Sequence, residues 1–149
     1  MSEVPVLRTA RLVLREHRPS DLDAYAALWA NADVVRFIGG KPLDAEAAWG
    51  RILRYRGMWA ALGFGFWVIE HDGRLIGEAG VQDVHRAIEP SLAGTLECGW
   101  AIVPAFHGKG LARECVDALH TVVSDAAPVG DVPPAEVVPT LAEDYEQAA

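Results

Sequence analysis

The sequence is poor in cysteine and has no long apolar run. Its 149 residues include two cysteines, Cys98 and Cys115. So small a number excludes a disulfide framework and a paired-cysteine metal motif, and predicts that both thiols are small core residues. No stretch approaches the roughly 20 apolar residues that cross a bilayer, and acidic Glu3 stands where a signal peptide would be basic. We therefore expect a cytoplasmic protein.

Basic residues are missing from the end of the chain. Lysine and arginine are absent after Arg113, whereas acidic residues continue and account for the whole net charge of −8. Non-specific nucleic-acid binding depends on basic side chains that neutralise phosphates. A neutral body with an acidic end is therefore not expected to bind nucleic acid. The length and the 51% hydrophobic content are sufficient for the core of one domain.

The first half of the chain predicts one strand and two helices. The stretch from Arg8 to Arg15 holds three aliphatic residues between basic ones and predicts an opening strand. The first helix is expected to begin with Ser20 as N-cap and Asp23 closing a capping box, and the second with Asp44 as N-cap. The apolar residues at helical spacing, expected in the core, are Leu22, Tyr25, Ala26, Leu28 and Trp29 in the first helix and Trp49, Ile52, Leu53 and Trp59 in the second.

A hairpin follows the helices. Two apolar runs, Phe64 to Glu70 and Leu75 to Val84, flank an Asp-Gly pair at 72–73. Asp-Gly between apolar runs is a strong local signal for a hairpin turn. A surface connection is expected over 86–94.

The stretch from Leu96 to His120 predicts a strand, a glycine turn and a helix. The strand stops at Pro104, because proline cannot donate to a ladder. Apolar residues recur at helical spacing from Gly110 on. Between them, the glycines of 107–110 permit unusual dihedral angles and leave consecutive backbone N–H groups at a helix start. This turn is either a concavity for an anion such as phosphate or simply a tight turn. The spacing of a Walker loop is absent.

The hexamer His107-Gly108-Lys109-Gly110-Leu111-Ala112 resembles the acetyl-CoA pyrophosphate loop of the GNAT N-acetyltransferases, Gln/Arg-x-x-Gly-x-Gly/Ala, with His107 at the first position. The preceding Glu97 to Ile102 is similar to the fourth strand of that family. The resemblance covers roughly residues 7 to 124 and extends to the ribosomal-protein N-terminal-acetyltransferase branch. It implies an α/β fold with a mixed sheet, the GNAT-like acyl-CoA N-acyltransferase fold, of which strands 1–4 and helices 1–3 are identified.

The resemblance also implies a cytoplasmic transferase that moves the acetyl group of acetyl-CoA to a primary amine, either a protein N-terminus or a small molecule. Glu97 matches the strand-four glutamate that many members use as a general base; the alternative is a solvated strand carboxylate. Acetyl-CoA is the implied cosubstrate, and no metal is implied. The residues implied to bind acetyl-CoA are Ile102 and Val103, through backbone N–H groups that orient the thioester, and His107, Gly108, Lys109, Gly110, Leu111 and Ala112 at the pyrophosphate.

The end of the chain departs from the family pattern. A GNAT-like domain is predicted over 1–124 and an acidic, proline-containing tail over 125–149, where truncation or a shifted reading frame is the hypothesis. Without a fifth strand, the fourth is an exposed edge unless Val137-Val138 or another chain covers it, which predicts a homo-oligomer. Tyr145 is the only tyrosine after the predicted helix that follows the glycine turn, and it lies in no motif that matches the family's general acid. The alternative function is a non-enzymatic remnant that serves as an oligomeric or protein-interaction module.

A thiol hydrolase is the second enzyme class that the sequence allows. Cys115 with His107 or His120 could serve as nucleophile and base of a thiol hydrolase. Because Cys115 falls on the apolar stripe of the predicted helix, this alternative is the weaker one.

Overall fold

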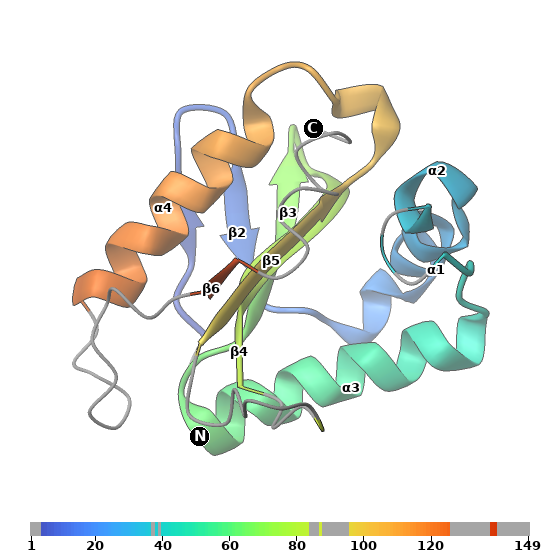
Figure 1. Ribbon diagram of the computed structural model, residues 1–149, viewed down its shortest axis with the longest axis horizontal. Helices are drawn as coiled ribbons and strands as arrows, with labels where there is room; N and C mark the ends of the chain where they lie inside the picture. Colours follow the sequence, from blue (N-terminus) through green and yellow to red (C-terminus); the bar gives the residue numbers. More distant parts are fainter. Residues whose placement is uncertain are drawn as a thin grey trace.

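The computed structural model describes residues 4–36, 38, 40–83, 87, 96–125 and 138–139. Within these residues the strands form one sheet in the order β1-β2-β3-β4-β5-β6 (Figure 1). Neighbours from β1 to β5 pair antiparallel, and β6 pairs parallel with β5. The strands are β1 Leu7–Arg8, β2 Val13–Arg15, β3 Phe66–His71, β4 Arg74–Gln82, β5 Glu97–Ile102 and β6 Val138–Pro139.

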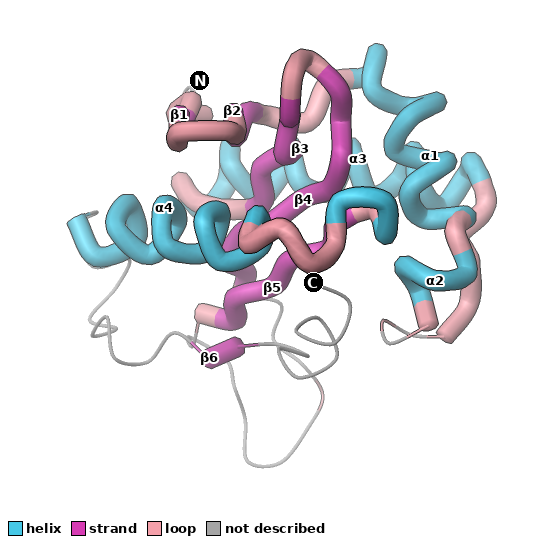
Figure 2. Tube along the Cα trace, turned by 90° about the horizontal axis from the view of Figure 1, so that it is seen from above, coloured by secondary structure: helices cyan, strands magenta, loops and turns pink. Residues whose placement is uncertain are grey.

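Helices cover both faces of the sheet. Figure 2 shows α4 on one face and α1, α2 and α3 on the other. The mixed sheet and the α/β class predicted from the sequence are confirmed. The helices are α1 Leu22–Ala30, α2 Ala32–Val35, α3 Ala45–Leu62 and α4 Leu111–Asp125, with short 3-10 turns η1 Pro19–Asp21 and η2 Pro104–Phe106.

Local signals explain where several elements begin and end. The Asp44 carboxylate accepts from the backbone N–H of Ala47 at 2.8 Å, so the predicted N-cap of α3 is confirmed. Gly63 ends this helix with a φ of 77°, the left-handed conformation common after a helix. Asp72 and Gly73 both have positive φ, at 50° and 76°, as a two-residue hairpin turn between β3 and β4 requires.

The opening strand is a hairpin rather than the single strand predicted over 8–15. Leu7 pairs with Leu14, and the backbone N–H of Thr9 donates to the Leu12 carbonyl at 2.9 Å, which closes the turn. The Thr9 side chain also accepts from the Leu12 N–H at 3.0 Å. The sequence gives no signal for this turn, because the turn contains neither glycine nor proline.

The predicted capping box of the first helix is also wrong. Pro19 occupies the first turn position, so the cap is Arg18, and Asp21 accepts from the Arg18 N–H at 2.7 Å. The roles assigned to Ser20 and Asp23 are therefore filled by Arg18 and Asp21, each two residues earlier. Proline at the first position fixes this register, because its missing N–H is one that a helix start leaves unpaired.

The inward face of α3 is narrower than predicted. Ile52 and Trp59 are buried, but Trp49 and Leu53 are 38% and 47% exposed. Both were expected in the core, yet α3 contacts the sheet along another line. Its buried residues are Ala48, Ile52, Tyr55, Met58 and Trp59. In α1, by contrast, Tyr25, Leu28 and Trp29 are buried as predicted.

A buried carboxylate joins the sheet to α1. Glu78 of β4 is 1% exposed, and its Oε2 accepts from the Tyr25 hydroxyl and contacts Nε2 of His17, each at 2.8 Å. Burial and the nearby carboxylate raise the pKa of Tyr25 well above its usual value. The pairing satisfies a charge that would otherwise be costly in the core.

Arginine 15 forms a second buried polar network. Its guanidinium donates to both carboxylate oxygens of Asp21, at 2.8 and 2.9 Å, and to Glu70 at 2.7 Å. These bonds tie β2 to η1 and to β3. Side-chain hydrogen bonding to Asp21, which burial opposes, raises the pKa of Arg15.

Both cysteines are buried, as the sequence predicted. Burial raises the pKa of the Cys98 thiol to about 11 and that of Cys115 further. A nucleophilic thiolate needs the opposite shift, so the thiol-hydrolase alternative loses its nucleophile.

Several sequence predictions fall outside the described residues. They are the connection over 86–94 apart from residue 87, most of the tail over 125–149, and Tyr145. Val138 of β6 lies beside Glu97 of β5, so the described part of the tail does pair with the edge of β5. In the described part of the chain, no helix combines the length and apolarity of a membrane span.

Candidate functional site

The glycine loop lies where β5 gives way to α4. Gly108 and Gly110 both have a φ of 74°, in the left-handed region, and Lys109 lies between them. The Gly110 carbonyl accepts from the Glu114 N–H at 3.1 Å, which starts the helix directly at the loop. Leu111 and Ala112 are therefore in the first turn, where backbone N–H groups have no intrahelical acceptor. Alternating left-handed glycines before a helix N-terminus make a concavity suited to an anion.

His107 joins this loop to the end of β5. Its Nε2 lies 2.6 Å from the Ile102 carbonyl oxygen. Since a carbonyl can only accept, Nε2 carries the proton and donates. The first residue of the hexamer thus anchors the loop to the strand that precedes it.

Ile102 and Val103 differ in the direction of their backbone groups. The Val103 N–H donates to the Ile76 carbonyl of β4 at 2.7 Å. Because backbone direction alternates along a strand, the Ile102 N–H points to the other side of β5, away from β4. Of the two predicted N–H donors, the one at Ile102 faces the edge of the strand, whereas the one at Val103 is used in the sheet.

Glu97 is the first residue of β5 and is 4% exposed, so the simple alternative of a solvated carboxylate is wrong. It lies opposite Gln82 of β4 and forms polar or electrostatic contacts in the fold. It shares a face with Gly99, two residues further along the strand. The structure thus places Glu97 at one end of β5 and the glycine loop beyond the other end.

Two facing glycines leave this face of the sheet open to an aromatic ring. Gly80 of β4 pairs with Gly99 of β5. A Cβ at Gly80 would lie 2.4 Å from Cα of Phe66, and one at Gly99 would lie 3.4 Å from the Phe66 ring. Tyr55 of α3 stacks on that ring with centroids 4.7 Å apart. Glycine is thus required at Gly80 for close packing, and the aromatic pair fills the space beside it.

The structure adds residues at the loop that the sequence did not indicate. Arg11 of the β1–β2 turn donates from Nε to Glu114 of α4 at 2.8 Å and from Nη1 to the Lys109 carbonyl at 2.9 Å. The Thr9 hydroxyl donates to the same Glu114 carboxylate. These residues are more than 100 positions apart from Glu114, so no local periodicity could have found them.

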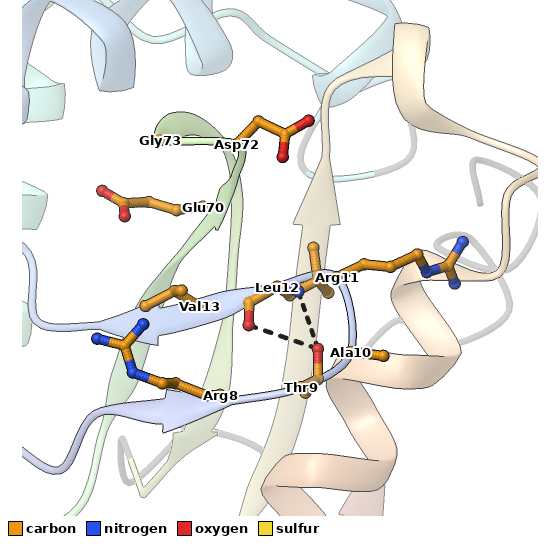
Figure 3. A pocket seen from close by; sticks show the side chains of 9 residues that line it. All are labelled: Arg8, Thr9, Ala10, Arg11, Leu12, Val13, Glu70, Asp72 and Gly73. Atoms are coloured by element: carbon orange, nitrogen blue, oxygen red, sulfur yellow. Dashed lines mark hydrogen bonds between the residues drawn. The ribbon is translucent and has the colours of Figure 1, made fainter.

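A surface pocket of about 300 Å³ lies between the β1–β2 turn and the β3–β4 turn (Figure 3). In the figure the side chains of Arg11 and Arg8 extend in opposite directions from the turn. None of the residues predicted to bind acetyl-CoA lines it. The lining residues are Arg8, Thr9, Ala10, Arg11, Leu12, Val13, Glu70, Asp72 and Gly73.

No group of three or more histidine, cysteine, aspartate or glutamate side chains that could hold a metal is found within the described ranges. The described site consists of backbone donors, a lysine and a buried carboxylate.

A glycine loop between a strand of a mixed sheet and the start of a helix is typical of proteins that bind an anionic group at that helix end. Comparison with known proteins makes this class specific. The family model described as acetyltransferase (GNAT) domain matches residues 11–133. The chain belongs to the GNAT acetyltransferase family.

Solved structures agree with this assignment. A protein from Bordetella pertussis described as a GNAT-family acetyltransferase is 32% identical, with a TM-score of 0.74, over 83% of this chain and 74% of that one. An acetyltransferase from Agrobacterium tumefaciens C58 is 28% identical, with a TM-score of 0.67, over 84% and 70%. A ribosomal L7/L12 α-N-protein acetyltransferase in complex with coenzyme A is 17% identical and shares the fold, with a TM-score of 0.64 over 80% and 68%.

Proposed function

We propose that this chain transfers the acetyl group of acetyl-CoA to a primary amine. The observation that carries the proposal is the left-handed pair Gly108 and Gly110 at the start of α4, in a chain with a GNAT domain. Family membership supports acetyl transfer from acetyl-CoA. The residues that would perform it are proposed from the family resemblance together with the geometry described above, and the acceptor is proposed from the resemblance to relatives alone.

The loop would hold the pyrophosphate through its backbone. The N–H groups of Gly108 to Ala112 are the proposed donors, and the helix dipole favours negative charge at this end. Lys109 adds a positive charge, but its Nζ lies 5.2 Å over the Phe106 ring, so its ammonium is directed to that ring. Backbone donors therefore contribute more than the lysine side chain.

The Ile102 N–H at the edge of β5 is the proposed contact for the thioester arm. An arm bonded along this edge would be held in extended form, with its carbonyl close to backbone donors. Such positioning contributes proximity and stabilises the oxyanion that develops during attack. His107 already bonds the Ile102 carbonyl, which fixes the end of the strand for this role.

Glu97 is the proposed general base. The amine must lose a proton to attack the thioester carbonyl, and a carboxylate can accept it directly or through one water. The burial of Glu97 lowers the local dielectric and strengthens its interaction with a bound ammonium. No acid for the departing thiolate is proposed, because Tyr145, the only tyrosine after α4 in the sequence, matches no motif of the family's general acid.

A protein N-terminus is the acceptor we favour. The coenzyme A complex with this fold is an acetyltransferase of the ribosomal L7/L12 α-amino group. The sequence resembles the same branch in Arg36 to Gly40, Trp49 to Trp59 and Gly63 to Trp67, as well as in Glu97 to Ala112. Small-molecule amines are the second acceptor class for the screen described below.

Substitution of the loop glycines tests the cosubstrate site. The full chain is expected to bind acetyl-CoA in the micromolar range by isothermal titration calorimetry. Gly108→Val and Gly110→Val are each expected to weaken binding by roughly 100-fold, about 2.7 kcal/mol, because a branched residue at positive φ turns the backbone donors away. Acetylation of peptides with free N-termini and of small amines is then followed by mass spectrometry.

Gly63, at the end of α3, provides the matched control. Its φ is 77°, close to the 74° of Gly108, and a Cβ at either position meets nothing within 4 Å. Gly63→Val thus introduces the same backbone strain outside the site and is expected to bind acetyl-CoA like the unmodified chain. Absence of binding by the folded, unmodified chain would overturn the proposal in favour of a non-enzymatic interaction module.

A further inference from the structure

We propose that Arg11 and Glu114 are positioning residues that hold the glycine loop in the conformation that binds pyrophosphate. This inference rests on the proposed function, and it assigns part of the cosubstrate site to the N-terminal hairpin. The two residues are 103 positions apart in the sequence and meet beside the loop. We call Thr9, Arg11 and Glu114 the hairpin clamp.

In the hairpin clamp, the Arg11 guanidinium donates hydrogen bonds to two acceptors. Its Nε donates to Oε1 of Glu114 at 2.8 Å, and its Nη1 donates to the Lys109 carbonyl at 2.9 Å. The Arg11 backbone N–H and the Thr9 hydroxyl both donate to Oε2 of Glu114. Both carboxylate oxygens are thus occupied by the hairpin, and the guanidinium extends from this pair to the loop.

The bond to the Lys109 carbonyl determines where the next N–H points. In a planar trans peptide the carbonyl oxygen and the following N–H point in opposite directions. Arg11 holds the Lys109 carbonyl toward the hairpin, so the Gly110 N–H is directed to the opposite side. The Gly110 carbonyl is fixed in turn by the Glu114 N–H, which directs the Leu111 N–H away from the helix body. Two successive donors are therefore oriented before any anion binds, and preorganisation of this kind raises affinity.

Arg11 also neutralises a charge that would oppose the cosubstrate. Burial favours the neutral form of Glu114, but hydrogen bonds from Thr9 and Arg11 outweigh it and lower the pKa of this carboxyl. Glu114 is therefore a carboxylate at neutral pH, one turn from the proposed phosphate site. Without the guanidinium, it would repel a bound pyrophosphate.

The turn between β3 and β4 supports the hairpin from a second direction. His71 Nδ1 lies 3.0 Å from the Arg11 carbonyl, to which it donates, and its ring meets Phe106 edge-on with centroids 5.5 Å apart. Lys109 Nζ in turn lies over the Phe106 ring. The hairpin, the β3–β4 turn and the β5–α4 connection thus meet around one loop.

The test compares acetyl-CoA binding by the full chain and by clamp variants. Arg11→Lys keeps the charge but loses the fork that reaches both acceptors, and Glu114→Gln removes the charged partner. Arg11→Lys is expected to raise the Kd of acetyl-CoA roughly tenfold, and Glu114→Gln to raise it by less, because it releases Arg11 but also removes the negative charge. Because both changes break one unit, the double variant is expected to bind no more than a few-fold more weakly than either single variant. At saturating acetyl-CoA, kcat is expected to stay unchanged.

Arg56 is the matched control. Its side chain is 42% exposed and pairs with Glu16 of the segment between β2 and η1, much as the 43% exposed Arg11 pairs with Glu114. Arg56→Lys is expected to leave the Kd unchanged, and the thermal midpoints of the clamp variants are expected to shift no further than that of this control. Clamp variants that bind acetyl-CoA as tightly as the unmodified chain would overturn the inference and leave the proposed function intact. An unmodified chain that does not bind would overturn both.

Discussion

Replacement of Arg15 by alanine is expected to lower the free energy of unfolding by about 3–5 kcal/mol, the cost of removing one partner from a buried ion pair. Arg15 donates two hydrogen bonds to Asp21 and a third to Glu70. Asp21 is 8% exposed, so alanine at position 15 would leave its carboxylate buried and unpaired. Urea denaturation followed by circular dichroism measures the loss.

Two further variants separate pairing from packing. Arg15→Met combined with Asp21→Asn fills most of the same volume and leaves no unpaired carboxylate on η1, so it is expected to recover part of the stability. Arg74 is an exposed arginine of β4, and Arg74→Ala is expected to change stability by no more than about 0.5 kcal/mol. A loss on Arg15→Ala no larger than that of Arg74→Ala would contradict the prediction.

The same pair makes stability depend on pH. Burial raises the pKa of Asp21, but the bonds from Arg15 and the Arg18 N–H outweigh it and lower that pKa below its usual 3.8. A carboxyl with a depressed folded pKa contributes stability above its unfolded pKa and loses this contribution as the pH falls through the folded value. The unmodified chain is therefore expected to lose stability below about pH 4, and Asp21→Asn to be less stable at neutral pH with a flatter acid limb.

Replacement of Glu97 by glutamine is expected to lower kcat by about 10²- to 10⁴-fold, the usual contribution of a general base. Glutamine keeps the shape and burial of the side chain on β5 but cannot accept the proton of the ammonium. The Kd of acetyl-CoA is expected to stay the same, because the glycine loop lies beyond the other end of the strand. Mass spectrometry of the acetylated product gives the rate with the best acceptor of the amine screen.

The pH profile and a conservative variant identify the role of Glu97. Loss of a general base removes one limb of the pH–activity profile. A defect that is only structural would leave both limbs in place. Glu97→Asp retains a carboxylate and is expected to show intermediate activity. Equal kcat in Glu97→Gln and the unmodified chain would assign this carboxylate to the structure of β5 instead.

Structural features that depend on residues close together in the sequence could be predicted from it. Asp44 caps α3 and the Asp72-Gly73 pair turns the β3–β4 hairpin, because each signal acts within a few residues. The glycine loop was identified in the same way, since its conformation depends on glycine at two nearby positions. These local rules also place Glu97 at the start of a strand.

Features that depend on distant partners could not be predicted. The hairpin clamp joins residues more than 100 positions apart in the sequence, and the Arg15 network joins β2, η1 and β3. The direction of the Val103 N–H depends on the register with β4, which no single segment specifies. The exposure of Trp49 and Leu53 depends on how α3 rotates against the sheet, and helical spacing alone leaves that rotation open.

The burial of Cys98 and Cys115 has a practical consequence for enzymology. Colorimetric thiol reagents react with an accessible thiolate, and neither cysteine offers one in the folded chain. Acetyl transfer liberates coenzyme A, whose thiol is fully accessible, so the colour that develops would count turnovers without a contribution from the protein. When the chain unfolds, both cysteine thiols become accessible. The rate at which the same reagent reacts in the absence of substrate therefore measures global unfolding.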